Sequence, residues 1–508
     1  MSVLQLNGND LTLETFAQVV LEHRPVELEP AARQRVLEAR AVVDDLVAGD
    51  RVAYAITTGV GHLADVRISN DQARELQINL VRSHAVGVGD PLSQSESRGM
   101  MLLRANSLAK GFSGVRPVVI ETLCQMLNKG VHPVIPSQGS VGASGDLAPL
   151  SHQALVLIGE GEAWYQGRRM SGGEALAAAG IEPLQLQAKE TISLINGTQA
   201  MLSVGSLALL ESQTLAATAD VLASITLDAL QGTDVAFDER IHLARPHPGQ
   251  LQVAQNLREM LRGSKLRERH RGCTRVQDAY TMRCVPQVHG AVRDVLDYAL
   301  KVFETEMNSA VDNPLVFVHP GKPGEGEVIS GGNFHGQPIA FALDFLGISV
   351  GTLAGISERR IERLVNPALS EGLPPFLATG AGLNSGFMMP QVTAAALVSE
   401  NKVLAHPASA DSITTSGNKE DYVSMGMTAG LKLKRILQNV RNVLAIEALA
   451  AAQAIDLVTP LPPSPRAQKA LQEIRAVSPK VEQDRSLAPD IARVAEVIRQ
   501  GKLAAALD

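Results

Sequence analysis

Three long stretches of this chain, at about residues 196–231, 336–365 and 424–458, are nearly free of proline and predict long helices. In the first stretch, apolar and small side chains occupy the whole circumference of the helix, which is typical of a helix inside a bundle or an oligomer. Aromatic residues, which are preferred in strands, make up only 3% of the sequence. The sequence therefore predicts a mainly α-helical protein built around a bundle of long antiparallel helices.

Breaks in this pattern divide the chain into three consecutive regions. Residues 1–195 are expected to form an N-terminal domain, in which glycine and proline separate loops and short helices. Within it, Ser93 and Glu96 have the spacing of a capping box and predict the start of a helix. Residues 196–460 hold the long helices, and a proline-rich segment then leads into a helical tail at 461–508.

The charge and cysteine content restrict the partners and the compartment. The formal net charge is −7, so no basic field favours nucleic acid or an anionic membrane, and a small-molecule partner fits better. The three cysteines, Cys124, Cys273 and Cys284, form an odd and widely spaced set, which indicates free thiols in a reducing compartment. No signal-peptide pattern opens the chain, and no window of about 18 uninterrupted apolar residues predicts a membrane span. We expect a cytoplasmic protein without a metal site, because no metal-ligand spacing is present.

The tripeptide Ala143-Ser144-Gly145 lies between Gly142 and Asp146, where small residues allow the backbone to bend sharply and approach itself. Attack of the Gly145 amide nitrogen on the Ala143 carbonyl carbon would close a five-membered ring. Loss of two waters, one of them from the Ser144 hydroxyl, would leave a methylidene-imidazolone with an exposed electrophilic methylene. Side chains supply nucleophiles, acids and bases but no good electrophile, so such a ring would fix the class of reaction. On the tripeptide alone, an ordinary Gly/Ser loop is the alternative interpretation.

Other blocks of the sequence decide between these interpretations. They are Thr58–Gly61, Asn79–His84, Asn196–Gln199, Gln277–Tyr280, Gly331–His335 and Asn418–Asp421. With these blocks the chain resembles the aromatic amino acid ammonia-lyases, and among them the enzymes that act on histidine. The blocks are spread over nearly the whole chain, so their number and order make the resemblance specific.

The resemblance implies a fold of the ammonia-lyase and fumarase type, assembled as a homotetramer with active sites built from three subunits. It also implies that Ala143, Ser144 and Gly145 form the 4-methylidene-imidazol-5-one group (MIO) autocatalytically, with no external cofactor. The amine of an amino acid is a poor leaving group and its β-proton is barely acidic. An electrophile that engages the substrate would therefore suit the elimination of ammonia.

Tyr54 matches the position of the family's catalytic tyrosine, so the resemblance implies that it removes the β-proton of the substrate. A tyrosine has a pKa near 10, so this role requires a lowered pKa near neutral pH. Without the resemblance, a packed tyrosine is the simpler interpretation. Tyr280 joins the catalytic set by resemblance.

Arg283 is the natural anchor for the α-carboxylate of a substrate, because a guanidinium binds a carboxylate through two parallel hydrogen bonds. It would share a helical face with Tyr280, three residues earlier, if this segment is helical. Asn196 offers an amide that could hold the carboxylate or the amino group, although Asn-Gly also fits a plain turn. Gln277 and Phe334 are expected to complete the pocket by resemblance.

His84 and Glu420 are the candidates for recognition of the substrate side chain. An imidazole has two ring nitrogens that need partners, and a carboxylate together with a second histidine could supply them. A carboxylate buried against a phenyl ring would be costly, so Glu420 argues against phenylalanine. For His84, a core histidine with satisfied hydrogen bonds is the alternative.

The prediction from the sequence is an enzyme that converts L-histidine to trans-urocanate and ammonia. A tyrosine or phenylalanine ammonia-lyase and an MIO aminomutase are enzyme alternatives, and an inactive helical scaffold is the alternative from another class. Four residues depart from the usual pattern of the histidine enzymes, and they leave substrate range and rate open. These residues are Thr57, Val60, Gln337 and Tyr422.

Overall fold

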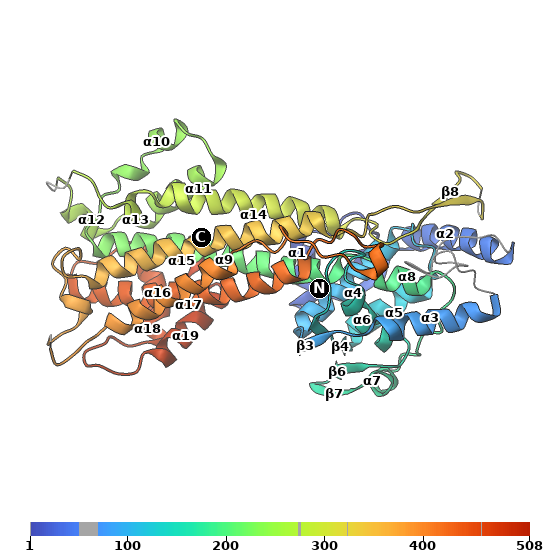
Figure 1. Ribbon diagram of the computed structural model, residues 1–508. Helices are drawn as coiled ribbons and strands as arrows, with labels where there is room; N and C mark the ends of the chain where they lie inside the picture. The colour runs from blue at the N-terminus through green and yellow to red at the C-terminus, as the bar shows by residue number, and fades with distance from the viewer. Residues whose placement is uncertain are drawn as a thin grey trace. The chain divides into compact units, whose positions relative to one another are not determined.

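The computed structural model describes residues 2–49, 70–272, 276–322, 324–380, 382–458 and 460–507 (Figure 1). Over these residues the chain is mainly α-helical, as the sequence predicts, with short strands in small sheets. The chain forms two compact units. Unit 1 comprises 1–207, 300–343 and 407–431, and unit 2 comprises 208–299, 344–406 and 432–508. The three consecutive regions expected from the sequence divide the chain differently and stay a prediction.

Unit 1 combines short helices with small sheets. The helices that lie wholly within it are α1 (Leu13–Val20), α2 (Pro30–Ala48), α3 (Asn70–His84), α4 (Gln94–Ala109), α5 (Pro117–Lys129), α6 (Leu147–Leu157), α7 (Gly172–Ala178), α8 (Glu190–Ile195) and the 3-10 turn η4 (Ser416–Asn418). Strand β1 (Leu4–Leu6) pairs in parallel with β2 (Val26–Leu28). The antiparallel sets are β3 (Val88–Pro91) with β5 (Pro136–Gln138), β8 (Leu315–Val318) with β9 (Gly326–Ile329), and β4 (His132–Pro133) with β6 (Glu162–Tyr165) and β7 (Arg168–Ser171).

Helix α4 forms much of the core of unit 1. Ser93 caps its N-terminus by accepting a hydrogen bond from the Glu96 amide, and the Glu96 side chain accepts from the Ser93 amide in return. This confirms the capping box predicted from the sequence and satisfies amides that have no partner within the helix. Nearly the whole helix is buried, including the side chains of Arg98 and Arg104.

Four long helices pass from one unit into the other: α9 (Gln199–Ala229), α14 (Val285–Met307), α15 (Gln337–Val365) and α17 (Gly426–Val458). Three of them confirm the long helices predicted from the sequence. Helix α14 was not among the long helices predicted from the sequence. Pro286 is tolerated because it lies in the first turn, where its missing amide needs no partner. Along the chain, α14 leads from unit 2 to unit 1, opposite to the other three.

In unit 2 the long helices are accompanied by shorter helices and 3-10 turns. Its further elements are α10 (Glu239–Leu243), α11 (Pro248–Leu261), α12 (Lys265–Arg269), α13 (Tyr280–Arg283), α16 (Met388–Leu404), α18 (Pro465–Val477), α19 (Ala488–Arg499) and the 3-10 turns η2 (Val235–Phe237), η3 (Pro375–Leu377) and η5 (Ala504–Leu507). The side chain of Glu447 on α17 ties together α9 and α15, since it accepts hydrogen bonds from Thr226 and Arg360. The helical tail expected from the sequence is present as α18 and α19.

Helices α9 and α15 are each long and apolar enough to cross a bilayer. However, 67% and 61% of their most apolar windows are buried inside the protein. A helix in the core of a protein has the same length and composition, so these two helices are weak evidence for a membrane span.

Candidate active site

Ser144 lies in a tight bend between β5 and α6. Gly142 and Gly145 have φ values of +68° and +69°, which glycine adopts without the strain that a side chain would impose. A Cβ atom on Gly145 would also collide with the carbonyl of Gly197. The small residues around Ser144 therefore allow the backbone to turn back on itself, which ring closure requires.

The segment that joins α8 to α9 holds one side of this bend. The side-chain amide of Asn196 donates to the Ser144 carbonyl at 2.7 Å, and the Asp146 amide donates to the Gly197 carbonyl at 2.7 Å. Gly145 and Gly197 also form an isolated parallel bridge. The backbone from Ser144 to Asp146 is thus fixed against this segment at three successive residues.

The residues before α15 and α17 hold the other side. The Met425 amide donates to the Val141 carbonyl at 2.9 Å, and the Ser424 hydroxyl donates to the Gly142 carbonyl at 2.9 Å. The Gly336 amide donates to the same Gly142 carbonyl at 3.2 Å. Three parts of unit 1 that are far apart in the sequence therefore define the conformation of the loop.

Asp146 is fully buried directly behind the loop, at the start of two helices. It is the N-cap residue of α6, and its carboxylate accepts from the Met201 amide in the first turn of α9 at 2.8 Å. Ser140 donates to its other oxygen at 2.7 Å. Burial raises the pKa of Asp146 to about 6, against the opposing effect of these hydrogen bonds.

A cavity of about 270 Å³ opens beside the loop, and Ser144, His84 and Glu420 line it together. The Ser144 hydroxyl donates to Glu420 Oε1 at 2.6 Å. The structure therefore brings together three residues that the sequence singled out, from three separate parts of the chain.

Thr415 fixes the carboxylate of Glu420 and was missed by sequence reasoning. Its hydroxyl donates to Glu420 Oε2 at 2.7 Å, and its amide donates to the Glu420 carbonyl at 2.9 Å. Ser416 and Asn418 between them have positive φ values of 52° and 70°, which turn the chain back. The glycine and asparagine at 417 and 418 were a signal for such a turn. The turn makes a side chain five residues away a neighbour of Glu420.

His84 presents one ring nitrogen to the protein. Its Nδ1 lies 2.9 Å from the Leu80 carbonyl, which can only accept, so the Nδ1 atom carries a proton. Burial lowers the pKa of His84, although the Leu80 carbonyl and the Glu420 carboxylate act in the opposite direction. The imidazole is therefore neutral near pH 7, with an acceptor lone pair at Nε2.

Asn196 is buried, and its Oδ1 atom has no hydrogen-bond partner among the residues that the structure describes. Its Nδ2 atom is used by the Ser144 carbonyl. The unpaired oxygen is an acceptor, which suits a substrate ammonium or amine better than a carboxylate.

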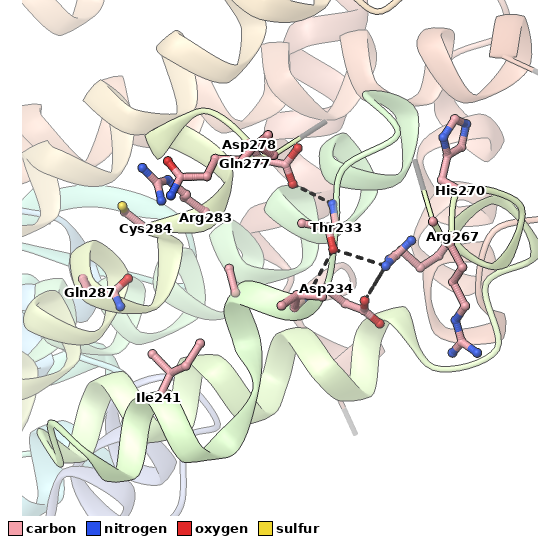
Figure 2. A pocket seen from close by; sticks show the side chains of 15 residues that line it. Thr233, Asp234, Ile241, Arg267, His270, Gln277, Asp278, Arg283, Cys284 and Gln287 are labelled. Carbon is pink, nitrogen blue, oxygen red and sulfur yellow. Dashed lines mark hydrogen bonds and ion pairs between the residues drawn. The ribbon is translucent and has the colours of Figure 1, made fainter. Parts of the chain in front are cut away.

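Gln277, Tyr280 and Arg283 belong to unit 2, and none of them lines the cavity around Ser144. Gln277 and Arg283 instead line another cavity, of about 780 Å³. Figure 2 shows how their side chains lie in it. The guanidinium carbon of Arg283 lies 4.7 Å from the centre of the Tyr280 ring, which confirms that the two share a helical face on α13. The Tyr280 side chain is 70% exposed, so the structure leaves it open to a partner.

The remaining predicted residues have other surroundings. Tyr54, Thr57 and Val60 lie outside the described residues. Phe334 is half-buried in the turn before α15 and does not line the cavity around Ser144. Tyr422 stacks on His335 with ring centres 6.1 Å apart.

The chain is similar in sequence and in fold to known proteins. A family model described as aromatic amino acid lyase matches residues 11–476. A histidine ammonia-lyase from Koribacter versatilis (strain Ellin345) is 69% identical, over 100% of this chain and 99% of its own length. The crystal structure of histidine ammonia-lyase from Trypanosoma cruzi has a TM-score of 0.91 and 43% identity, covering 100% of this chain and 95% of that one. Tyrosine aminomutase from Streptomyces globisporus has a TM-score of 0.94 and 39% identity, covering 99% and 98%.

Proposed function

The chain belongs to the aromatic amino acid lyase family, and we propose that it removes ammonia from L-histidine to give trans-urocanate. It is a carbon–nitrogen lyase, as are the relatives that cover its whole length. The main support for histidine as the substrate is the cavity that Ser144, His84 and Glu420 line together.

His84 and Glu420 recognise the imidazole of the substrate. The neutral His84 ring has its Nδ1 proton engaged by Leu80, so Nε2 accepts a hydrogen bond from a ring N–H. The Glu420 carboxylate accepts from the other ring nitrogen when that nitrogen is protonated. A phenyl ring offers neither contact and would leave the carboxylate desolvated without a partner, which disfavours phenylalanine.

While Ser144 is an intact serine, its hydroxyl donates a hydrogen bond to Glu420 Oε1. Ring formation removes that hydroxyl as water, which releases Oε1 as an acceptor for the substrate. Thr415 continues to hold Oε2, so the carboxylate keeps its orientation. The loss of water that forms the electrophile at position 144 therefore also frees Glu420 to bind the substrate.

The residues around Ser144 fit an MIO group. The bend is tight, Ala143 and Gly145 are small, and the space beside Gly145 admits no Cβ atom. The group would supply an electrophilic methylene at position 144, which no side chain offers. Asn196 donates to the Ser144 carbonyl, an oxygen that is retained on ring closure, and withdraws electron density from it.

Other residues bind the amino acid part and move the proton. Tyr54 is the base for the β-proton, and Arg283 binds the α-carboxylate through its two parallel N–H groups. The free Oδ1 of Asn196 accepts from the amine. Tyr280 and Gln277 line the amino acid part of the site, and Phe334 closes it.

The enzyme acts as a homotetramer in the cytoplasm. Ser144, His84 and Glu420 lie in unit 1, whereas Arg283 lies in unit 2 beside the 70% exposed Tyr280. A site shared among subunits would cover this tyrosine and supply the carboxylate anchor. Cys124 and Cys284 are free thiols, which supports a reducing compartment.

Two measurements test this function. Intact-mass analysis of purified protein should show the loss of two waters, about 36 Da, and an unmodified mass would favour an inactive scaffold. The protein is then assayed with histidine, tyrosine and phenylalanine, and absorbance distinguishes urocanate from coumarate or cinnamate. A β-amino acid product on chromatography would identify an aminomutase instead.

A further inference from the structure

Arg104 on α4 is a fully buried cation that binds one short stretch of backbone. Its Nη1 donates to the Ser193 carbonyl at 2.9 Å, and its Nη2 donates to the Asn196 carbonyl at 2.9 Å. Nη2 also donates to the side-chain oxygen of Gln199. All three acceptors lie at the junction between α8 and α9.

This junction needs an external donor. Helix α8 ends at Ile195, and the last carbonyls of a helix have no partner within it. The guanidinium supplies donors in a fixed fork, which a lysine cannot reproduce. Gly197, at φ +146°, allows the approach, since a Cβ atom there would lie 2.5 Å from Arg104 Nη2.

The same junction holds the loop of Ser144. Asn196 donates to the Ser144 carbonyl, and the Gly197 carbonyl accepts from the Asp146 amide. Arg104 bonds to the Asn196 carbonyl, so it acts on the loop through one intervening residue. It touches neither Ser144 nor the cavity beside it.

The charge of Arg104 is retained despite its burial. Burial lowers its pKa to about 10, against the opposing effects of Asp312 and Asp146, so it remains protonated at neutral pH. Asp312 is itself bound by Lys189 at 2.9 Å, and Asp146 by Ser140 and Met201. Burying a cation is costly, so the hydrogen bonds that the α8–α9 junction supplies to Arg104 offset part of that cost.

We propose that Arg104 is a positioning residue for the formation of the electrophile, because it holds the α8–α9 junction against which the Ser144 loop bends. This inference rests on the proposed function. In the first step the Gly145 nitrogen bonds to the Ala143 carbonyl carbon. The Ala143 oxygen leaves as water with the amide protons of Gly145 and Ser144. The second water takes the Ser144 hydroxyl and its α-proton, and no oxidant is required.

Asn196 links this geometry to the second step. Its hydrogen bond to the Ser144 carbonyl withdraws electron density next to the α-carbon, which makes the α-proton more acidic. Displacement of the α8–α9 junction would weaken that hydrogen bond and would also loosen the bend of the Ser144 loop. Loss of Arg104 should therefore slow the release of both waters without removing any group that reacts.

Arg98 provides a matched control on the same helix. It is also buried, and it donates to two carbonyls at 2.9 and 2.6 Å, those of Leu127 and Val19. Burial lowers its pKa to about 10 as well. Its acceptors lie outside the α8–α9 junction, so Arg98→Gln removes an equivalent buried cation without releasing the loop.

The test compares wild type, Arg98→Gln, Arg104→Lys and Arg104→Gln as full-length proteins purified by size exclusion. The fraction of folded protein that has lost two waters is measured by intact mass at intervals after synthesis. We expect wild type and Arg98→Gln to mature fully, Arg104→Lys more slowly, and Arg104→Gln least, by about tenfold in rate. The turnover number should fall with the matured fraction while KM stays constant.

Full maturation of either folded Arg104 variant at the rate of Arg98→Gln would overturn the inference. Arg104→Lys keeps the charge and decides the question if Arg104→Gln does not fold. An unmodified mass in wild type would refute the proposed function itself. If wild type loses the two waters and the Arg104 variants lose them at the same rate, only the role of Arg104 is refuted.

Discussion

Arg104 in unit 1 and Arg360 in unit 2 are both fully buried, but they bind different kinds of partner. Arg104 donates to backbone carbonyls and a neutral amide, whereas Arg360 forms two parallel hydrogen bonds to the Glu447 carboxylate, at 2.6 and 2.8 Å. The first arrangement fixes the path of the backbone, and the second joins two long helices through opposite charges. In these two cases, a buried guanidinium fixes a backbone segment beside the Ser144 loop in unit 1 and joins two long helices in unit 2.

The largest effect should come from the loop itself. Ser144→Ala removes the proposed precursor of the electrophile and should lower turnover by at least about 1000-fold. Steady-state assay of urocanate formation measures this loss. Thermal unfolding should change little, because only a half-buried hydroxyl is removed. Turnover near the wild-type value would contradict the assignment of Ser144.

In the bundle, a substitution should affect stability instead of turnover. Glu447→Ala leaves Arg360 buried without its partner and should lower the free energy of unfolding by about 3 to 5 kcal/mol. Denaturant unfolding measures the loss, and turnover per folded molecule should be retained. Glu121→Ala, which removes an exposed pair with Arg33, is the control and should cost less than about 1 kcal/mol. Equal effects of the two substitutions would show that the buried pair stabilises the bundle no more than an exposed pair does.

Glu420→Gln sharpens the assignment of the cavity in unit 1. The variant keeps the size of the side chain but loses the charge that we propose accepts from the imidazole N–H. Its kcat/KM for histidine should fall by about 100-fold, the value of a hydrogen bond to a charged group. Activity on phenylalanine should fall much less. Equal losses on both substrates would separate Glu420 from substrate recognition.

Buried histidines in the two units have different hydrogen-bond partners, and a pH experiment tests the one in unit 1. Burial lowers the pKa of His132 in unit 1 to about 4, with Arg98 and His23 acting in the same direction. Its Nδ1 has no hydrogen-bond partner among the described residues, whereas Nδ1 of His289 in unit 2 binds Asp220 at 2.7 Å. An unfolded histidine binds a proton near pH 6.5, so His132 destabilises the fold as the pH falls below that value.

His132→Gln should therefore reduce the acid sensitivity of the protein. At pH 5 the loss of stability relative to pH 7.5 should be smaller than in wild type by about 1 to 2 kcal/mol. Urea unfolding at the two pH values measures it. His319→Gln, at an exposed position, is the control. An unchanged pH dependence in His132→Gln would show that other groups cause the acid sensitivity.

The smallest effect concerns the support of Glu420. Thr415→Val removes the hydroxyl that donates to Oε2 and keeps the shape of the side chain. We expect kcat/KM for histidine to fall by only about fivefold, because the hydroxyl orients the carboxylate and does not itself contact the substrate. Thr214→Val, whose hydroxyl donates only to the Leu210 carbonyl of its own helix, is the control. A Thr415→Val variant as active as Thr214→Val would make the contact incidental.

The sequence predicted what depends on neighbouring residues. The capping box of Ser93 and Glu96 is a contact over three positions, and three of the long helices follow from patterns within single segments. The single turn that brings Arg283 over Tyr280 is equally local. Helix α14 was not predicted from the sequence; its Pro286 occupies the first turn, where a proline is tolerated.

The resemblance to a family pointed to His84, Ser144 and Glu420 before any geometry was known, and the structure brings these three to one cavity. The supports of the cavity had no such signal. Thr415 depends on a turn with positive φ values, and Arg104 reaches residues about ninety positions away. The glycine and asparagine at 417 and 418 signal the turn but not the contact between Thr415 and Glu420, and no local pattern marks the partners of Arg104.

By itself, the sequence determined the helical class, the long helices and a loop of small residues that can bend onto itself, because these features depend on side-chain size and spacing within a few turns. Only the tertiary structure decided which carbonyls Arg104 caps and how Glu420 meets a serine 276 positions earlier. Such contacts join segments that are distant in the chain, and they form only when the whole core has packed.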